Sequence, residues 1–154
     1  MSISMSLDVP GFAVKVVRVK NAANLMVIGN DGNSEKGAPI TLREESGNLW
    51  QQWLISDAPS GDGYYFQNRK VEKVLDNQNS EKSGTGIIQY SINGEAWQRW
   101  LIDGTGGGYY YIVNVEHPEF VLACHDNAKP GDRLIQEDRQ DDQLRQKWIF
   151  DHVN

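Results

Sequence analysis

The residue patterns that commonly mark a catalytic or metal-binding site do not occur in this sequence. The single cysteine, Cys124, is followed by His125. Neighbouring residues of a strand point to opposite faces, so this thiol and imidazole are not expected to form a nucleophile–base pair. The glycine-rich stretch 104–108 lacks the Lys-Ser/Thr of a phosphate-binding loop. Gly-x-Ser-x-Gly, His-Glu-x-x-His and Cys-x-x-Cys motifs are absent from the sequence. We therefore predict no catalytic residues, no metal site and no cofactor.

The most regular feature of the chain is a Gln-x-Trp triplet that occurs three times, each time followed by a short apolar run. The triplets begin at Gln51, Gln98 and Gln146 and end at Trp53, Trp100 and Trp148. Three glycines precede the triplets at almost the same spacing, namely Gly37, Gly84 and Gly131. Self-similarity at a constant period indicates one supersecondary unit in several copies that share a core. The sequence therefore predicts an internal threefold repeat.

Each repeat contains four short segments rich in Val, Ile, Leu and Tyr, separated by turn-forming residues, and this pattern predicts strands of an all-β fold. The expected strands are 13–19, 25–28, 40–43 and 53–56, then 64–68, 73–76, 87–91 and 100–103, then 109–115, 120–124, 134–137 and 148–151. One such repeat is too small to bury its own apolar face, so the three must close around a common axis. We predict a single domain over residues 1–154, with pseudo-symmetric repeats at about 12–58, 62–104 and 108–152.

The composition narrows the class of protein. A chain of 154 residues with 39% hydrophobic content is long enough for one packed domain, and it has no apolar stretch of the roughly 18 residues that a membrane span needs. Its 21 acidic and 15 basic residues, spread without long blocks, argue against a nucleic-acid partner. The first six residues lack the features of a secretory signal, and one cysteine excludes an internal disulfide. We expect a cytoplasmic protein, or one released without a recognisable signal peptide, and no membrane insertion.

With its three Gln-x-Trp repeats, the chain from Phe12 to His152 resembles the ricin-type β-trefoil lectin family and is similar to its small fungal cytosolic members. The resemblance implies a β-trefoil that binds carbohydrate and is not an enzyme. In such repeats a large indole packs beneath a hairpin, and a Gln amide pairs with buried backbone groups that are costly to leave unpaired. We therefore assign structural roles to the Gln and Trp of each triplet: Gln51, Trp53, Gln98, Trp100, Gln146 and Trp148.

The same resemblance implies a sugar site made by an Asp at the end of a second strand and a Gln in the third strand. The second repeat fits best, with Asp76 and Gln89 at these positions. If Leu75 and Ile88 face the core, strand alternation places Asp76 and Gln89 on the outward face, where both can meet a ligand.

Two further positions of the family site carry other residue types here. Ser91 stands where the aromatic platform is expected, and Trp97 stands where an Asn precedes the triplet. Trp97, which has Trp50 as its counterpart in the first repeat, is expected either to stack on the sugar or to extend the packing under the hairpin. Tyr90 is expected to point inward.

The other two repeats depart further from the pattern. The first has Gly29 and Leu42 in place of the Asp and Gln, so we expect it to have lost the site. The third keeps Gln136 but has Ala123 in place of the Asp. His125 lies two residues further on the same strand face, and we expect it either to supply the missing contact or to be a solvated loop histidine.

The leading functional prediction is a non-enzymatic lectin for glycans that contain galactose or N-acetylgalactosamine, on glycoproteins or glycolipids, acting mainly through the second repeat. A homodimer is expected because a weak single site gains most from multivalency. The alternative is a β-trefoil protease inhibitor that presents a basic loop residue, either at Arg69–Lys70 or at Lys36. A third reading is a structural or signalling trefoil without a ligand.

Overall fold

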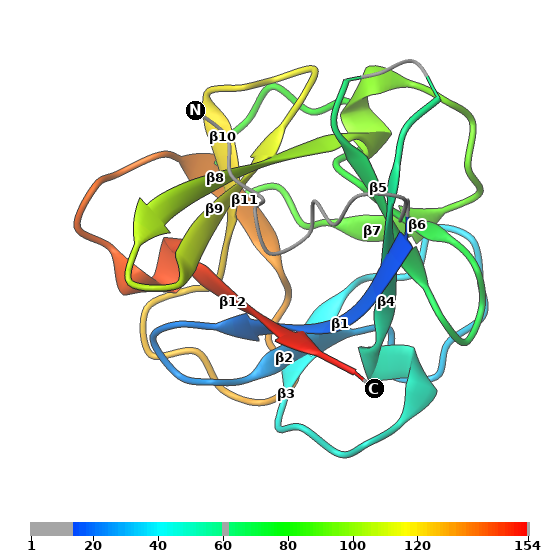
Figure 1. Ribbon diagram of the computed structural model, residues 1–154, viewed down its shortest axis with the longest axis horizontal. Helices are drawn as coiled ribbons and strands as arrows, with labels where there is room; N and C mark the ends of the chain where they lie inside the picture. The colour runs from blue at the N-terminus through cyan, green and yellow to red at the C-terminus, as the bar shows by residue number, and fades with distance from the viewer. Residues whose placement is uncertain (1–13, 60–61, 154) are drawn as a thin grey trace.

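The computed structural model describes residues 14–59 and 62–153. Within these residues the chain forms twelve strands and three one-turn 3-10 helices, and no α-helix (Figure 1). The all-β prediction is confirmed. The predicted start of the first strand at residue 13 and the N-terminal segment considered for a signal lie outside the described residues, as do residues 60 and 61 of the first inter-repeat joint.

The strands fall into three groups of four, one group for each repeat. The first repeat holds β1 (Val14–Asn21), β2 (Val27–Gly29), β3 (Thr41–Arg43), η1 (Leu49–Gln51) and β4 (Trp53–Asp57). The second holds β5 (Tyr64–Asn68), β6 (Val74–Asp76), β7 (Ile88–Tyr90), η2 (Ala96–Gln98) and β8 (Trp100–Gly106). The third holds β9 (Tyr109–Asn114), β10 (Phe120–Ala123), β11 (Ile135–Asp138), η3 (Leu144–Gln146) and β12 (Trp148–His152). Each observed strand overlaps one that the sequence predicts.

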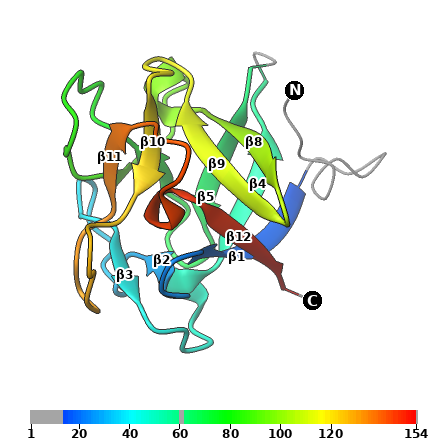
Figure 2. The same cartoon turned by 90° about the vertical axis from the view of Figure 1, so that its left-hand side faces the viewer.

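Half of the strands close into an antiparallel barrel in the order β1, β4, β5, β8, β9, β12 and back to β1. The others form the hairpins β2–β3, β6–β7 and β10–β11. Figure 2 shows β3 and β11 at the end of the barrel opposite the C terminus. Bridges between Pro39 and Ile88, Gly86 and Ile135, and Thr41 and Arg133 join each hairpin region to the next. The architecture is a β-trefoil, and residues of two repeats meet beside every hairpin.

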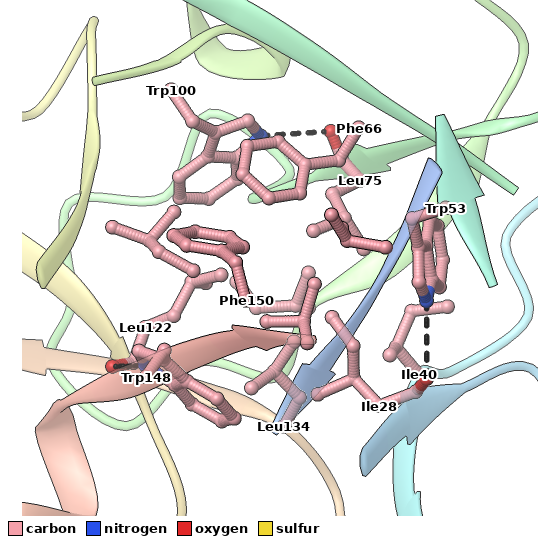
Figure 3. Close-up of a cluster of buried hydrophobic side chains, with 14 of the residues drawn as sticks. Ile28, Ile40, Trp53, Phe66, Leu75, Trp100, Leu122, Leu134, Trp148 and Phe150 are labelled. Carbon is pink, nitrogen blue, oxygen red and sulfur yellow. Dashed lines mark hydrogen bonds between the residues drawn. The ribbon is translucent and has the colours of Figure 1, made fainter. Parts of the chain in front are cut away.

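The three triplet tryptophans are fully buried and occupy equivalent positions in the core (Figure 3). Each indole N–H donates to a carbonyl in the second strand of its own repeat. The acceptors are Ile28 for Trp53 at 3.0 Å, Leu75 for Trp100 at 3.3 Å and Leu122 for Trp148 at 3.0 Å. A buried indole therefore supplies a large apolar surface and leaves no donor unpaired. All three tryptophans thus lie in the core, where the sequence analysis expects them.

The triplet glutamines are also fully buried and act alike in the three repeats. Each side-chain oxygen accepts a backbone N–H, from Ser46, Asn93 and Gln140 respectively. Each amide donates to the backbone carbonyl of a residue that follows the third strand or ends it, namely Glu44, Ser91 and Asp138. The glutamines thus satisfy backbone groups of the turn that leads back to the barrel, as the sequence predicts.

Candidate functional site

A surface pocket of about 320 Å³ lies in the second repeat, beside β6, β7 and η2. It is lined by Asp76, Gln78, Asn79, Ile88, Tyr90, Asn93 and Trp97. These side chains include one carboxylate, three amides and two aromatic rings, so the pocket offers hydrogen-bond donors, acceptors and flat apolar surface together. Such a set suits a ligand that has hydroxyl groups on some edges and C–H groups on a face.

Asp76 lies at the end of β6 and lines this pocket, but it is only 3% exposed. Its Oδ1 accepts the backbone N–H of Gln78 at 2.6 Å, and its Oδ2 accepts the amide of Gln98 at 2.9 Å. Burial raises the pKa of Asp76, and these two hydrogen bonds oppose the rise. The prediction of a freely exposed carboxylate is wrong. Since a carboxylate has about four lone-pair sites, Asp76 keeps capacity for a ligand donor.

Gln89 does not face the pocket, so its predicted role in sugar binding is wrong. It is fully buried, and its amide donates to the carbonyls of Asn33 and Glu35 at 2.8 and 2.9 Å. Its side-chain oxygen accepts the amide of Asn30 at 2.9 Å. Gln89 therefore attaches the β2–β3 loop of the first repeat to β7 of the second.

The prediction for Gln89 failed because the sequence analysis assigned the inward and outward side chains of β7 the wrong way round. Ile87 is the fully buried core residue of this segment, whereas Ile88 is half-buried and lines the pocket. Because the side-chain period of a strand is two, a shift of one residue moves every side chain to the other face. Gln89 therefore turns inward and Tyr90 turns outward, which also corrects the prediction that Tyr90 points inward.

Gln136 in the third repeat repeats the contacts of Gln89, and its predicted sugar contact is wrong for the same reason. It is fully buried, donates to the carbonyls of Ser80 and Lys82 at 3.1 and 2.9 Å, and accepts the amide of Asn77 at 3.0 Å. These contacts attach the β6–β7 loop of the second repeat to β11 of the third.

At the remaining repeat boundary the equivalent positions hold Leu42 and Cys124, and both belong to the apolar core. Leu42 stands in place of the Gln and Cys124 in place of the Asn, so both members of the polar pair are replaced and neither leaves a buried amide without a partner. Burial raises the pKa of the Cys124 thiol, as expected for an inward-facing cysteine that is not a nucleophile.

Trp97 is half-buried and lines the second-repeat pocket. Ser91 is exposed and is not among the lining residues; its carbonyl accepts the Gln98 amide at 3.0 Å. The aromatic ring on the third strand is Tyr90, one residue earlier than expected. Sequence reasoning also missed Asn93, although it follows the third strand by only a few residues.

In the first repeat, Trp50 fills the space that an aspartate side chain would occupy. A Cβ atom at Gly29 would lie 2.8 Å from both Cε3 and the carbonyl oxygen of Trp50. A separate pocket of about 400 Å³ lies nearby, lined by Arg43, Glu44, Ser46, Asn48, Trp50, Gln51 and Pro130. The first repeat therefore lacks the arrangement seen around Asp76.

The third repeat has a pocket of about 380 Å³ that also includes residues of the first repeat. It is lined by Ala23, Asn24, Cys124, His125, Asp126, Asn127, Ala128, Gln143, Leu144 and Arg145. Arg145 takes the position of Trp97 and forms ion pairs with Glu137 and, at 3.2 Å, with Asp126. His125 is exposed at this pocket, and no aromatic residue besides its imidazole is among the lining residues.

The basic residues named for an inhibitory loop are exposed, and the side chains of Arg69 and Lys36 contact other residues of the fold. The Arg69 guanidinium donates to Oε1 of Gln52 at 2.7 Å, and the Lys36 ammonium lies over the ring of Tyr90.

Over the part of the chain that the structure describes, no helix could cross a membrane, and no group of three His, Cys, Asp or Glu residues could hold a metal ion.

Comparison with known proteins places this geometry in context. The sequence profile of the family described as "Ricin-type beta-trefoil lectin domain-like" matches residues 9–90 and 66–137. The designed threefold-symmetric protein ThreeFoil is 25% identical over 90% of this chain and 99% of its own, with a TM-score of 0.84. The ricin B-like lectin of Macrolepiota procera, solved in complex with lactose, has a TM-score of 0.77 at 17% identity, over 94% of this chain and 100% of its own.

An exo-beta-1,3-galactanase from Clostridium thermocellum is 26% identical over 90% of this chain, with a TM-score of 0.82. This chain covers only 30% of the galactanase chain, so the likeness concerns one part of that enzyme. No curated protein sequence matches the chain.

Proposed function

The chain belongs to the ricin-type β-trefoil lectin domain-like family, and on this premise we propose that it is a non-enzymatic lectin that binds carbohydrate through the pocket of its second repeat. One observation carries the proposal. This pocket brings the Asp76 carboxylate together with the half-buried rings of Tyr90 and Trp97 and with the amide of Asn93. A carboxylate and an amide can bind neighbouring hydroxyls while an aromatic face covers the C–H face of a sugar ring.

The sugar class that we propose is galactose or N-acetylgalactosamine. The Asp position is the one that the family site uses for such sugars, and the similar lectin of Macrolepiota procera was solved with lactose, a galactoside. The partners would be galactose-containing glycans on glycoproteins or glycolipids.

The composition of the pocket also supports binding without catalysis. Glycoside hydrolysis commonly uses a pair of carboxyl groups that flank the scissile bond. Asp76 is the single carboxylic acid among the residues that line the second-repeat pocket. Its carboxylate is moreover held by Gln78 and Gln98.

A glycan array followed by titration with lactose tests the proposal. Wild type should bind galactosides, Asp76→Ala should bind at least tenfold more weakly, and His125→Ala should bind like wild type. If Asp76→Ala binds normally and His125→Ala does not, the site is the third-repeat pocket. If no glycan binds and the protein inhibits trypsin in a parallel assay, the inhibitor function replaces this proposal.

We further propose that two copies of the chain form a homodimer. A dimer carries two weak sugar sites, one on each chain, and therefore binds a glycan surface with higher avidity than a monomer. Light scattering at high micromolar concentration should give twice the 17.4 kDa mass of the chain. A monomer at that concentration contradicts the pairing and leaves the binding site unaffected.

A further inference from the structure

The aromatic wall of the second-repeat pocket is in contact with a residue of the first repeat. Lys36 Nζ lies 5.2 Å from the centroid of the Tyr90 ring, and Tyr90 lines the pocket. A cation within about 6 Å of an aromatic face is attracted by the electrons of the ring. The contact therefore holds a positive charge at the edge of the pocket.

The Lys36 charge is open to solvent. Its side chain is exposed, and none of the ion pairs between described residues involves it. The chain as a whole carries a net charge of -6, and Lys36 places a cation without an ion-pair partner among the described residues beside the pocket. Such a charge is available to an anionic group of a ligand.

The backbone on both sides of Lys36 is attached to β7. The carbonyl of Glu35 accepts the Gln89 amide at 2.9 Å, and the N–H of Gly37 donates to the Gln89 carbonyl at 2.8 Å. Gly37 has a φ of 89°, a left-handed conformation that glycine adopts without strain. Gln89 directly precedes Tyr90, so the same residue fixes the loop and the strand that carries the aromatic ring.

The equivalent loop position borders the pocket of another repeat as well. Pro130 occupies that position in the third repeat, and it lines the first-repeat pocket together with Arg43, the counterpart of Tyr90. The same backbone bond recurs there, from the N–H of Gly131 to the carbonyl of Leu42 at 2.7 Å. In two of the three repeats, the residue before this glycine thus lies beside the pocket of the following repeat. Among Lys36, Ser83 and Pro130, the three residues at this position, only Lys36 is charged.

We propose that Lys36 is a specificity-determining residue of the second-repeat site, and that it favours glycans with an anionic substituent, a carboxylate or a sulfate, next to the galactose-type sugar. The inference rests on the proposed function of that site. An exposed ammonium and an anion in water attract each other weakly, so the preference for the acidic glycan over the neutral one should be about twofold to fivefold. It should decrease as salt is added, because exposed charges are screened.

The test is a set of calorimetric titrations at low and high salt with lactose, 3′-sialyllactose and 3′-sulfated lactose. Wild type should bind at least one acidic sugar about twofold to fivefold more tightly than lactose, and the two acidic sugars show whether a carboxylate or a sulfate is preferred. Lys36→Ala should abolish the difference between the acidic sugars and lactose, and Lys36→Glu should reverse it. Lys82→Ala, an equal change of charge on the exposed β6–β7 loop, should behave like wild type.

Two results overturn the inference and differ in what they leave standing. In the first, wild type binds lactose in an Asp76-dependent manner, but either wild type shows no preference for the acidic sugars or Lys36→Ala keeps the preference that wild type shows. The site is then real, but Lys36 does not select the ligand. If neither lactose nor the acidic sugars bind wild type, the proposed function fails and the role of Lys36 fails with it.

Discussion

Replacement of Asp76 by alanine separates the two roles that the structure gives this carboxylate. Within the fold, the change removes the acceptor for the Gln78 backbone N–H and one of two acceptors of the Gln98 amide, which keeps its bond to the Ser91 carbonyl. Gln78 is exposed, so water can take the place of the lost acceptor on that side. The expected loss in the free energy of unfolding is therefore about 1 to 3 kcal/mol, the cost of partly unsatisfied buried polar groups.

The same substitution removes a charge-assisted hydrogen bond to the ligand. We expect lactose affinity to fall by roughly 1.5 to 3 kcal/mol, which is at least tenfold. Urea denaturation followed by tryptophan fluorescence measures the stability, and calorimetric titration with lactose under native conditions measures the affinity. Asp76→Asn should lose affinity to a similar extent with a smaller loss of stability, because its oxygen can still accept one of the two internal donors.

Asp138→Ala is the matched control, since Asp138 is exposed and only its backbone carbonyl accepts the Gln146 amide. Its stability should lie within about 0.5 kcal/mol of wild type, as is usual for a surface substitution. The reasoning is refuted if Asp76→Ala is as stable as this control, because the carboxylate then supports no buried partner. Unchanged lactose affinity in Asp76→Ala refutes the location of the site.

Three further predictions follow from the same contacts. Because burial raises the pKa of Asp76, the pH-dependent part of its contribution to stability is fully present below the ordinary aspartate pKa and is lost as pH rises through the raised pKa, while its hydrogen bonds with Gln78 and Gln98 still support the fold. Ligand binding needs the ionised form, so lactose affinity, measured across acidic pH, should fall while the pH is still above the ordinary aspartate range. A midpoint at the ordinary value would contradict this. Gln89→Leu should lower the free energy of unfolding, measured by urea denaturation, by about 2 to 4 kcal/mol, because it leaves the Asn30 amide and two loop carbonyls without their partner. Adding Asn30→Cys gives the residue pair found at the boundary between the third and first repeats, and it should recover part of the loss. Strictly additive effects of the two substitutions would argue against coupling between residues 30 and 89. Gly29→Asp should create no second sugar site and should lower the free energy of unfolding by about 1 to 3 kcal/mol, since its Cβ would lie 2.8 Å from the Trp50 ring. A stable variant that binds twice as many lactose molecules per chain would show that Trp50 moves aside.

The threefold repeat could be predicted from the sequence because its signals are local and recur at a constant spacing. Trp53, Trp100 and Trp148 are the largest apolar residues at equivalent positions, and burial of so much apolar surface leaves few alternatives to a shared core. Asp76 and Trp97 are expected at the site because of the resemblance to the ricin-type lectin family, and both line the second-repeat pocket.

Only the tertiary structure decides which face of β7 is buried and which loop lies beside it. Ile87 and Ile88 are equally apolar, and the packing of the hairpin against the core selects Ile87, which turns Gln89 inward and Tyr90 toward the pocket. The contacts of Gln89 then join residues 54 to 59 positions apart in different repeats. Lys36 reaches Tyr90 across the same boundary. These contacts depend on how the barrel closes and on which buried amides need hydrogen-bond partners. Neither factor produces a periodic pattern in the sequence.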